Sequence, residues 1–167
     1  MLHKIKQQKQ EGFTIIEVMI VLAIAGLIML VVFMAVPALN RSSHNTQRKN
    51  DVSSFLGAVQ EFTNNNGGTG PASSADVATV VSNFKPGFYT TTTNYYYTTT
   101  PPTVPLDIGS GAGSSSIVTT ENVILVKGAK CTSVQAAPTT DGATARSYAV
   151  VFAVEGGSKN VFQCQDS

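Results

Sequence analysis

One uninterrupted apolar run near the N-terminus constrains this chain more than any other feature. Between Phe13 and Val36 the only polar residues are Thr14 and Glu17, and the 19 residues from Val18 onward are uncharged. As a helix rising about 1.5 Å per residue, those uncharged residues would span roughly 28 Å, close to the ~30 Å hydrocarbon core of a bilayer. A buried helix of a soluble domain is seldom so uniform. We therefore predict that this run crosses a membrane.

The charges on either side of the run predict its orientation. Lys4, Lys6 and Lys9 precede it against the single acid Glu11, so a formal charge of +1 for the whole chain leaves −1 (8 basic, 9 acidic) for the rest. Under the positive-inside rule the basic end stays in the cytoplasm, and everything after Pro37 lies outside.

An ordinary secretory signal peptide is the alternative interpretation of this segment. Ala23-Ile24-Ala25 supplies the small-residue triplet at which such peptides are cleaved. However, the apolar part of a signal peptide is only about 7–15 residues long. Because this run continues well past Ala25, we favour a retained membrane helix.

Glu17 is the carboxylate inside the apolar run. A charged side chain there costs on the order of 2.5–3.5 kcal/mol at the bilayer centre, and less near the edge. Physical reasoning alone leaves two explanations open. Either Glu17 is solvated at the membrane interface, or it has a charged partner and a role.

The sequence Gly12-Phe13-Thr14-Ile15-Ile16-Glu17 resembles the processing motif of type IV prepilins and related pseudopilins. A basic leader ends in Gly, Phe follows, and a carboxylate comes five residues into the mature chain ahead of the apolar stretch. The likeness covers residues 1 to about 40. It implies that a prepilin peptidase cuts between Gly12 and Phe13 and methylates the Phe13 amine. It also implies that Glu17 neutralises the Phe13 amine of a neighbouring subunit, and that helicity is lost between Gly26 and Pro37 in the filament.

The same resemblance implies a function and a set of partners. The chain would be a pilin that waits in the cytoplasmic membrane and is polymerised with its own copies by a pilus assembly platform and its ATPase. The extracellular filament would serve adhesion, twitching motility on surfaces or DNA uptake. A pseudopilin of a type II secretion system, and a membrane-anchored binding module that never polymerises, are the alternatives.

The sequence pattern predicts an α+β fold, and the resemblance implies that it is a pilin fold in four parts: a cleaved leader (1–12), a transmembrane helix (13–36), an amphipathic helix half (37–66) and a β-rich head (67–167). In the amphipathic half, helical spacing relates the apolar side chains Val52, Phe55, Leu56, Val59 and Phe62. In the head we expect a helix at Asp76–Phe84 and strands at Phe88–Thr93, Asn122–Lys127, Arg146–Glu155 and Lys159–Cys164. The last two strands would form an antiparallel hairpin, and one face of the sheet would cover the amphipathic helix.

The polar residues of the amphipathic half are expected on a solvated face. They include Arg48, Lys49 and Asp51. Arg48 and Lys49 could instead contact lipid head groups or DNA. A nucleic acid partner is thus possible, but the near-neutral charge does not indicate one.

Two further features of the head lead to specific hypotheses. Cys131 and Cys164 lie in a segment expected outside the cell, where one disulfide is the simplest interpretation. Tyr95, Tyr96 and Tyr97 belong to a Thr/Tyr tract at residues 90–102, which we favour as strand or turn. The alternative is an exposed adhesive loop, because three consecutive rings cannot all face one side of a strand.

No pattern typical of catalysis emerges from the sequence. The mature part holds one histidine, His44, and shows no nucleophile–base set, paired carboxylates or metal-ligand spacing. The glycine-rich segment Asp107–Gly113 lacks the EF-hand pattern and the ending of a phosphate-binding loop. We therefore expect no enzyme activity, no cofactor and no metal.

Overall fold

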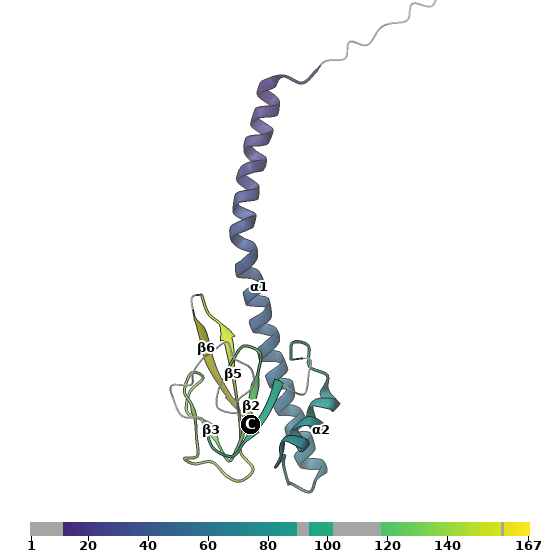
Figure 1. The fold of residues 1–167 in the computed structure, drawn as a ribbon, viewed down its shortest axis with the longest axis vertical. Helices are drawn as coiled ribbons and strands as arrows, with labels where there is room; N and C mark the ends of the chain where they lie inside the picture. Colours follow the sequence, from purple (N-terminus) through teal and green to yellow (C-terminus); the bar gives the residue numbers. More distant parts are fainter. Residues whose placement is uncertain (1–11, 90–93, 102–117, 158) are drawn as a thin grey trace, which may run out of the picture. The chain divides into compact units, whose positions relative to one another are not determined.

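A computed structural model of the chain describes residues 12–89, 94–101, 118–157 and 159–167 (Figure 1). The expected leader, apart from Gly12, lies outside these residues. So do residues 90–93 and 102 of the Thr/Tyr tract and the segment Asp107–Gly113. The chain divides into two compact units, residues 1–40 and 41–167, which are described separately below.

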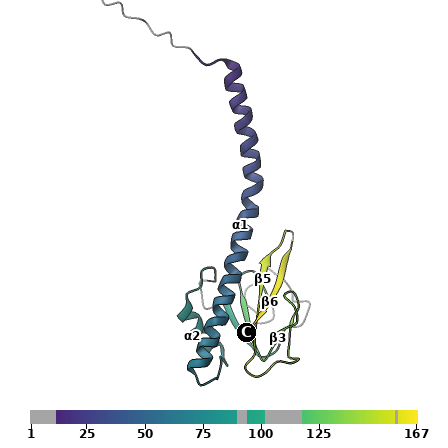
Figure 2. The same cartoon turned by 180° about the vertical axis from the view of Figure 1, so that it is seen from behind.

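The first unit consists of the N-terminal part of helix α1 (Ile15–Asn65). Its large apolar side chains are exposed, and an 18-residue window of α1 has a mean hydropathy of 3.1. By length and composition, α1 is able to cross a membrane. The helix is continuous through Gly26 and Pro37. Figure 2 shows the purple and blue part of α1 as one unbroken helical ribbon. Loss of helicity in the filament therefore stays a prediction about the assembled state.

The second unit is an α+β head built on a four-stranded sheet in the order β1-β2-β5-β6. The strands are β1 (Tyr95–Thr98), β2 (Val123–Lys127), β5 (Tyr148–Glu155) and β6 (Asn160–Asp166). β2, β5 and β6 pair antiparallel, whereas β1 runs parallel to β2. A separate pair joins β3 (Lys130–Cys131) to β4 (Pro138–Thr139), and the second helix is α2 (Ser74–Phe84).

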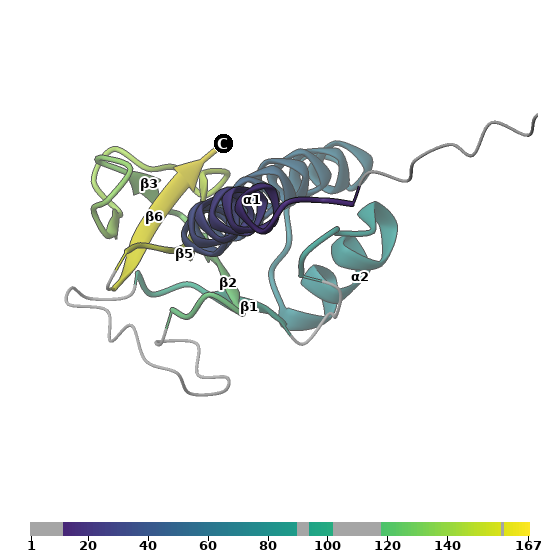
Figure 3. The same ribbon diagram turned by 90° about the horizontal axis from the view of Figure 1, so that it is seen from above.

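The sheet is buried on both faces, because β5 has an apolar residue at almost every position. One face of β5 shares a core with α2 and the second half of α1, and it contributes Tyr148, Val150, Phe152 and Val154. Figure 3 shows α1 and α2 as separate helices in the head. That half of α1 contributes Val52, Phe55, Leu56 and Val59. The opposite face of the sheet forms a second cluster from residues Val118, Ile124, Val126, Ala129, Ala149, Val151, Ala153 and Cys164.

The expected α+β architecture is confirmed, including the apolar stripe of α1, the α2 helix and the β5–β6 hairpin. The strand expected at Phe88–Thr93 is wrong for Phe88 and Tyr89, and its residues 90–93 lie outside the described residues; a strand is found at Tyr95–Thr98. Phe88 and Tyr89 are not in a strand because their N–H groups donate to the carboxylate of Asp51, at 2.6 and 3.0 Å, rather than to a neighbouring strand.

Candidate functional site

A capping box fixes the start of α1. Glu17 Oε2 accepts hydrogen bonds from the Thr14 N–H at 2.9 Å and from Thr14 Oγ1 at 2.6 Å. In return, the Glu17 N–H donates to Thr14 Oγ1 at 3.4 Å. A Thr at the N-cap and a Glu three residues later satisfy two helix-end donors reciprocally. The helix therefore begins at Ile15, and Gly12 and Phe13 precede it in non-helical backbone.

The three residues before the helix are exposed and have room around them. Phe13 is 89% exposed, and a Cβ added to Gly12 would meet no atom within 4 Å. Nothing within the described chain thus requires glycine at position 12. The same holds for Gly26, where an added Cβ also meets nothing within 4 Å, although glycine costs a helix interior up to about 1 kcal/mol.

The sequence carries a local signal for this arrangement. Thr14-x-x-Glu17 before an apolar run is the pattern of a capping box. Glu17 therefore has a partner within its own chain, in addition to any partner it gains on assembly. Both donors from Thr14 use Oε2, and a carboxylate offers about four acceptor positions on its two oxygens.

Arg48 connects the second half of α1 to the rest of the head. The sequence suggested that Arg48 is solvated, and this expectation is wrong. Its side chain is only 2% exposed. Its guanidinium donates to three oxygens: Thr120 O at 3.1 Å, Asn45 Oδ1 at 3.1 Å and Glu155 Oε1 at 2.8 Å. It also lies 4.2 Å from the centre of the Phe88 ring. Arg48 is therefore not available to lipid or DNA, whereas Lys49 is exposed as expected.

Asp51 is the second polar residue that the sequence placed wrongly at the surface. It is 8% exposed and accepts hydrogen bonds from three consecutive backbone N–H groups, those of Gly87, Phe88 and Tyr89, at 2.6–3.0 Å. A side chain from α1 thus satisfies the backbone of the segment between α2 and β1. Arg48 and Asp51 are one helical turn apart, so one polar stripe runs beside the apolar stripe.

The disulfide between Cys131 and Cys164 is confirmed, with the two Cα atoms 5.8 Å apart. It joins β3 to β6 next to two further links. The Cys164 N–H donates to Val134 O at 2.7 Å, and the Cys131 N–H donates to Asp166 Oδ2 at 3.0 Å. The bridge therefore fastens the β3–β4 segment onto the edge of the main sheet.

The three tyrosines of the tract form most of β1, in agreement with the favoured strand interpretation. Tyr95 is 5% exposed and its ring lies 4.8 Å from that of Phe55, so burial raises the pKa of its hydroxyl. Tyr96 and Tyr97 are half-buried and pack against the two opposite clusters. Tyr95 is thus a core residue, and only Tyr96 and Tyr97 have ring surface to offer a ligand.

A family model described as the prokaryotic N-terminal methylation motif matches residues 7–33. That match includes Gly12, Phe13, the capping box and most of the apolar run. This motif is typical of type IV pilins and prepilin-like proteins. No curated protein and no solved structure gave a match.

The prepilin motif carries consequences for processing. It implies cleavage by a prepilin peptidase and handling by the assembly machinery of type IV pili or type II secretion systems. Together with the exposed apolar helix, it indicates membrane anchoring before assembly. Pilin-like proteins are generally structural rather than enzymatic. Across the described ranges, no group of three His, Cys, Asp or Glu residues is placed to hold a metal ion.

Proposed function

We propose that this prepilin is cleaved between Gly12 and Phe13, methylated at Phe13 and polymerised into an extracellular type IV pilus. The observation that carries the proposal is the start of α1. The capping box leaves the Gly12–Phe13 bond exposed and outside the helix, and proteases act on such non-helical backbone. The apolar side chains that follow have no partner within their unit, and neighbouring subunits would cover them.

In the proposed filament, Glu17 pairs with the Phe13 amine of the next subunit. A carboxylate in an apolar filament core needs a partner, because an uncompensated buried charge costs several kcal/mol. The Thr14 donors bind Oε2, so an incoming amine would have Oε1 to bind without breaking the cap. The hydrogen bonds between Thr14 and Glu17 would then be kept while Glu17 binds the amine of the neighbouring subunit.

The N-terminus of the surface-exposed protein tests the processing step. We expect mass spectrometry to find a chain that starts at Phe13 and carries a methyl group on its amine. Replacing Gly12 with Val should block cleavage while leaving the head folded, since position 12 contacts nothing in the described chain. Recovery of residues 1–11 in extracellular filaments would contradict the proposal.

The motif is shared with secretion pseudopilins, so the type II secretion role is the main competing function. Abundant filaments on the cell surface that contain this chain would support the pilus, and genes for a secretion system around its own gene would support the pseudopilin. A chain that is processed but found only as a membrane-bound monomer would point to the binding module.

Two finer parts of the proposal concern the assembled filament. The segment from Gly26 to Pro37 would lose helicity there, because glycine favours the helix weakly and proline lacks an N–H donor. A filament reconstruction with continuous helix through this segment would refute that.

For surface recognition, Tyr96 and Tyr97 are the candidates. Replacing both with Ser should weaken attachment of cells without reducing filament number.

A further inference from the structure

A groove lies between the end of α1 and α2, within the head. Its volume is about 440 Å³, which falls within the roughly 300–1,000 Å³ typical of pockets that take small ligands. Side chains from the last two turns of α1 line one wall, and side chains from the second half of α2 line the other. Neither Tyr96 nor Tyr97 contributes to it, so this concave surface is distinct from the tyrosine tract.

The walls of the groove are held in place without a ligand. α1 ends in a turn where the Gly68 N–H donates to Thr63 O at 2.8 Å, and Gly67 and Gly68 have φ values of 65° and 86°. On the other wall, Phe84 packs against the core of the head, with its ring 5.9 Å from that of Phe55. The groove is thus formed in advance, which reduces the cost of ordering side chains when a ligand binds.

The rim of the groove carries polar side chains that are free to bind. Glu61, Asn65 and Asn83 are exposed, and within the described part of the chain they make no hydrogen bond or ion pair. Two amides and a carboxylate together offer both donors and acceptors. The half-buried rings of Phe62 and Phe84 line the same groove and add apolar surface. The groove therefore combines free amides with aromatic rings.

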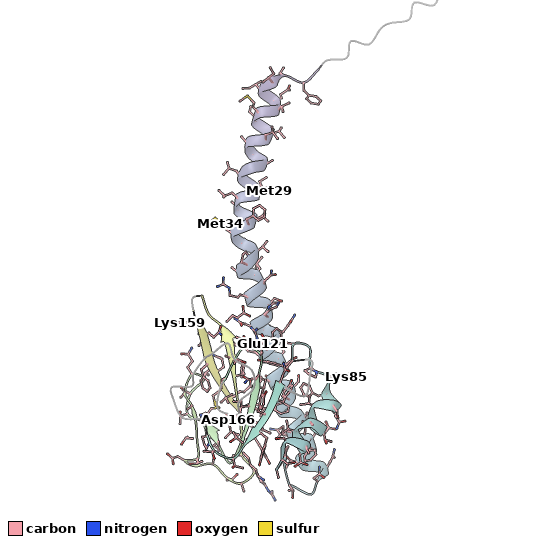
Figure 4. The ribbon with its side chains drawn as sticks, viewed as in Figure 1. Met29, Met34, Lys85, Glu121, Lys159 and Asp166 are labelled. Carbon is pink, nitrogen blue, oxygen red and sulfur yellow. A yellow bond between two sulfur atoms is a disulfide. The ribbon has the colours of Figure 1, made fainter. Side chains whose placement is uncertain are left out.

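The charges around the groove limit the class of ligand. Among the described residues that line it, Glu61 is acidic and none is basic. Asp76 of α2 accepts from the Ala72 N–H and the Ser73 hydroxyl and is not part of the lining. Lys85 is also outside the lining, and Figure 4 shows it next to α2. A phosphate, sulfate or carboxylate ligand would meet a carboxylate here and no cation, so a neutral ligand fits better.

We propose that the groove between α1 and α2 binds a neutral saccharide of one or two sugar units. Sugar hydroxyl groups both donate and accept, so they can bond to the amides of Asn65 and Asn83 and to the Glu61 carboxylate. The C–H face of a sugar ring is apolar and can lie against the aromatic surface of Phe62 and Phe84. This binding goes beyond the proposed filament function and would also occur in the unassembled subunit.

Saturation-transfer difference NMR tests the proposal on the full chain in phosphatidylcholine nanodiscs, which avoid detergents that themselves carry sugars. The probes are four neutral disaccharides that differ in linkage and substituents: maltose, cellobiose, lactose and diacetylchitobiose. Sialyllactose is the anionic comparison and spermidine the cationic one. We expect at least one neutral disaccharide to give a signal at millimolar concentration, strongest for the C–H protons of one ring face, and sialyllactose to bind more weakly.

Variants of the free amides locate the site. Asn65→Ala/Asn83→Ala should raise the Kd of the bound disaccharide by roughly 25-fold, about fivefold for each amide. The matched control Asn50→Ala/Asn64→Ala removes two exposed amides of α1 that do not line the groove and should leave the Kd unchanged. All four positions are exposed, so thermal unfolding of both double variants should stay close to that of the parent.

Three results would overturn the inference. None of the four disaccharides could give a signal at millimolar concentration, or the control could weaken binding as much as the groove variant. Alternatively, sialyllactose or spermidine could bind more tightly than every neutral disaccharide, which would assign the groove to a charged ligand. These measurements do not depend on filament formation, so their failure is distinct from a failure of the proposed pilus function.

Discussion

Among single residues, Asp51 makes the most concentrated set of contacts between α1 and the rest of the head. Its carboxylate accepts three backbone hydrogen bonds while 8% exposed. Asp51→Asn keeps the shape but removes the charge and turns an NH₂ group toward N–H donors. Since hydrogen bonds to charged groups contribute about 1.5–3 kcal/mol, we expect the free energy of unfolding to fall by roughly 2–3 kcal/mol.

Urea unfolding of the mature chain in detergent, followed by circular dichroism, measures this loss. The control is Asp141→Asn, which makes the same chemical change at an exposed turn residue and should shift stability by less than about 0.5 kcal/mol. If the two variants lowered the free energy of unfolding equally, the three hydrogen bonds of Asp51 would contribute nothing to stability beyond the effect of its charge.

At the scale of elements, α2 begins with a capping box of its own. The Ser73 hydroxyl accepts from the Asp76 N–H at 3.2 Å, and Asp76 Oδ2 accepts from the Ala72 N–H at 2.9 Å and from Ser73 Oγ at 3.0 Å. The Ala72 N–H bond and then the Ser73 hydroxyl bond lower the pKa of Asp76. Ser73→Ala should therefore cost about 1 kcal/mol of stability, as loss of an N-cap does elsewhere.

The pH dependence of that cap follows from the sign of the shift. Because the folded-state pKa of Asp76 lies below its unfolded value of about 3.9, the contribution is present above that value. It is lost as pH falls through the folded pKa. The stability difference between the parent and Asp76→Asn should be constant near pH 7 and shrink below about pH 4. Thermal unfolding from pH 7 to pH 3 would show this, and a difference that grows with acidity would contradict it.

The elements also show which parts of the fold the sequence predicts. Val52, Phe55, Leu56 and Val59 recur at helical spacing, and the alternation from Tyr148 to Val154 is regular, so both buried surfaces were readable. The residues that join those surfaces carry no periodic signal. Arg48 and Asp51 look like solvated helix residues until Glu155 and the Gly87–Tyr89 backbone, both distant in sequence, meet them. The parallel pairing of β1 likewise depends on a long connection with no pattern of its own.

The functional segment shows the same division. Gly12, Phe13 and Glu17 were proposed as functional residues because their order and spacing resemble the prepilin motif, and their roles stay predictions. The capping role of Thr14 is equally local, because Thr14 and Glu17 are only three residues apart. Burial of Tyr95 could not be predicted, because three identical adjacent residues give no indication of which ring faces the core.

At the scale of the whole molecule, Glu17 is predicted to act in both the subunit and the filament. Glu17→Gln keeps an acceptor for the Thr14 cap but removes the charge that would pair with an amine. We expect membrane insertion to be kept or improved. Filament number, counted by electron microscopy, should fall because the neighbouring Phe13 amine loses its counter-charge.

Thr14→Ala separates the two roles of Glu17. It removes the cap and keeps the carboxylate, so α1 should lose about 1 kcal/mol at its end while filaments still form. If Glu17→Gln leaves filament number unchanged, or if Thr14→Ala abolishes filaments as completely as Glu17→Gln, the assembly role of the charge is wrong.

The contact between Asn45 and Glu155 spans 110 residues of chain, which has a consequence for biosynthesis. A ribosome adds about 5–20 residues per second, so Asn45 and Arg48 wait several seconds before β5 is made. Until then the guanidinium of Arg48 lacks the Glu155 carboxylate that it contacts in the folded head. If the chain is inserted as proposed, the head would close only after the apolar helix has entered the membrane. A chain interrupted before residue 155 would then be anchored with an open head.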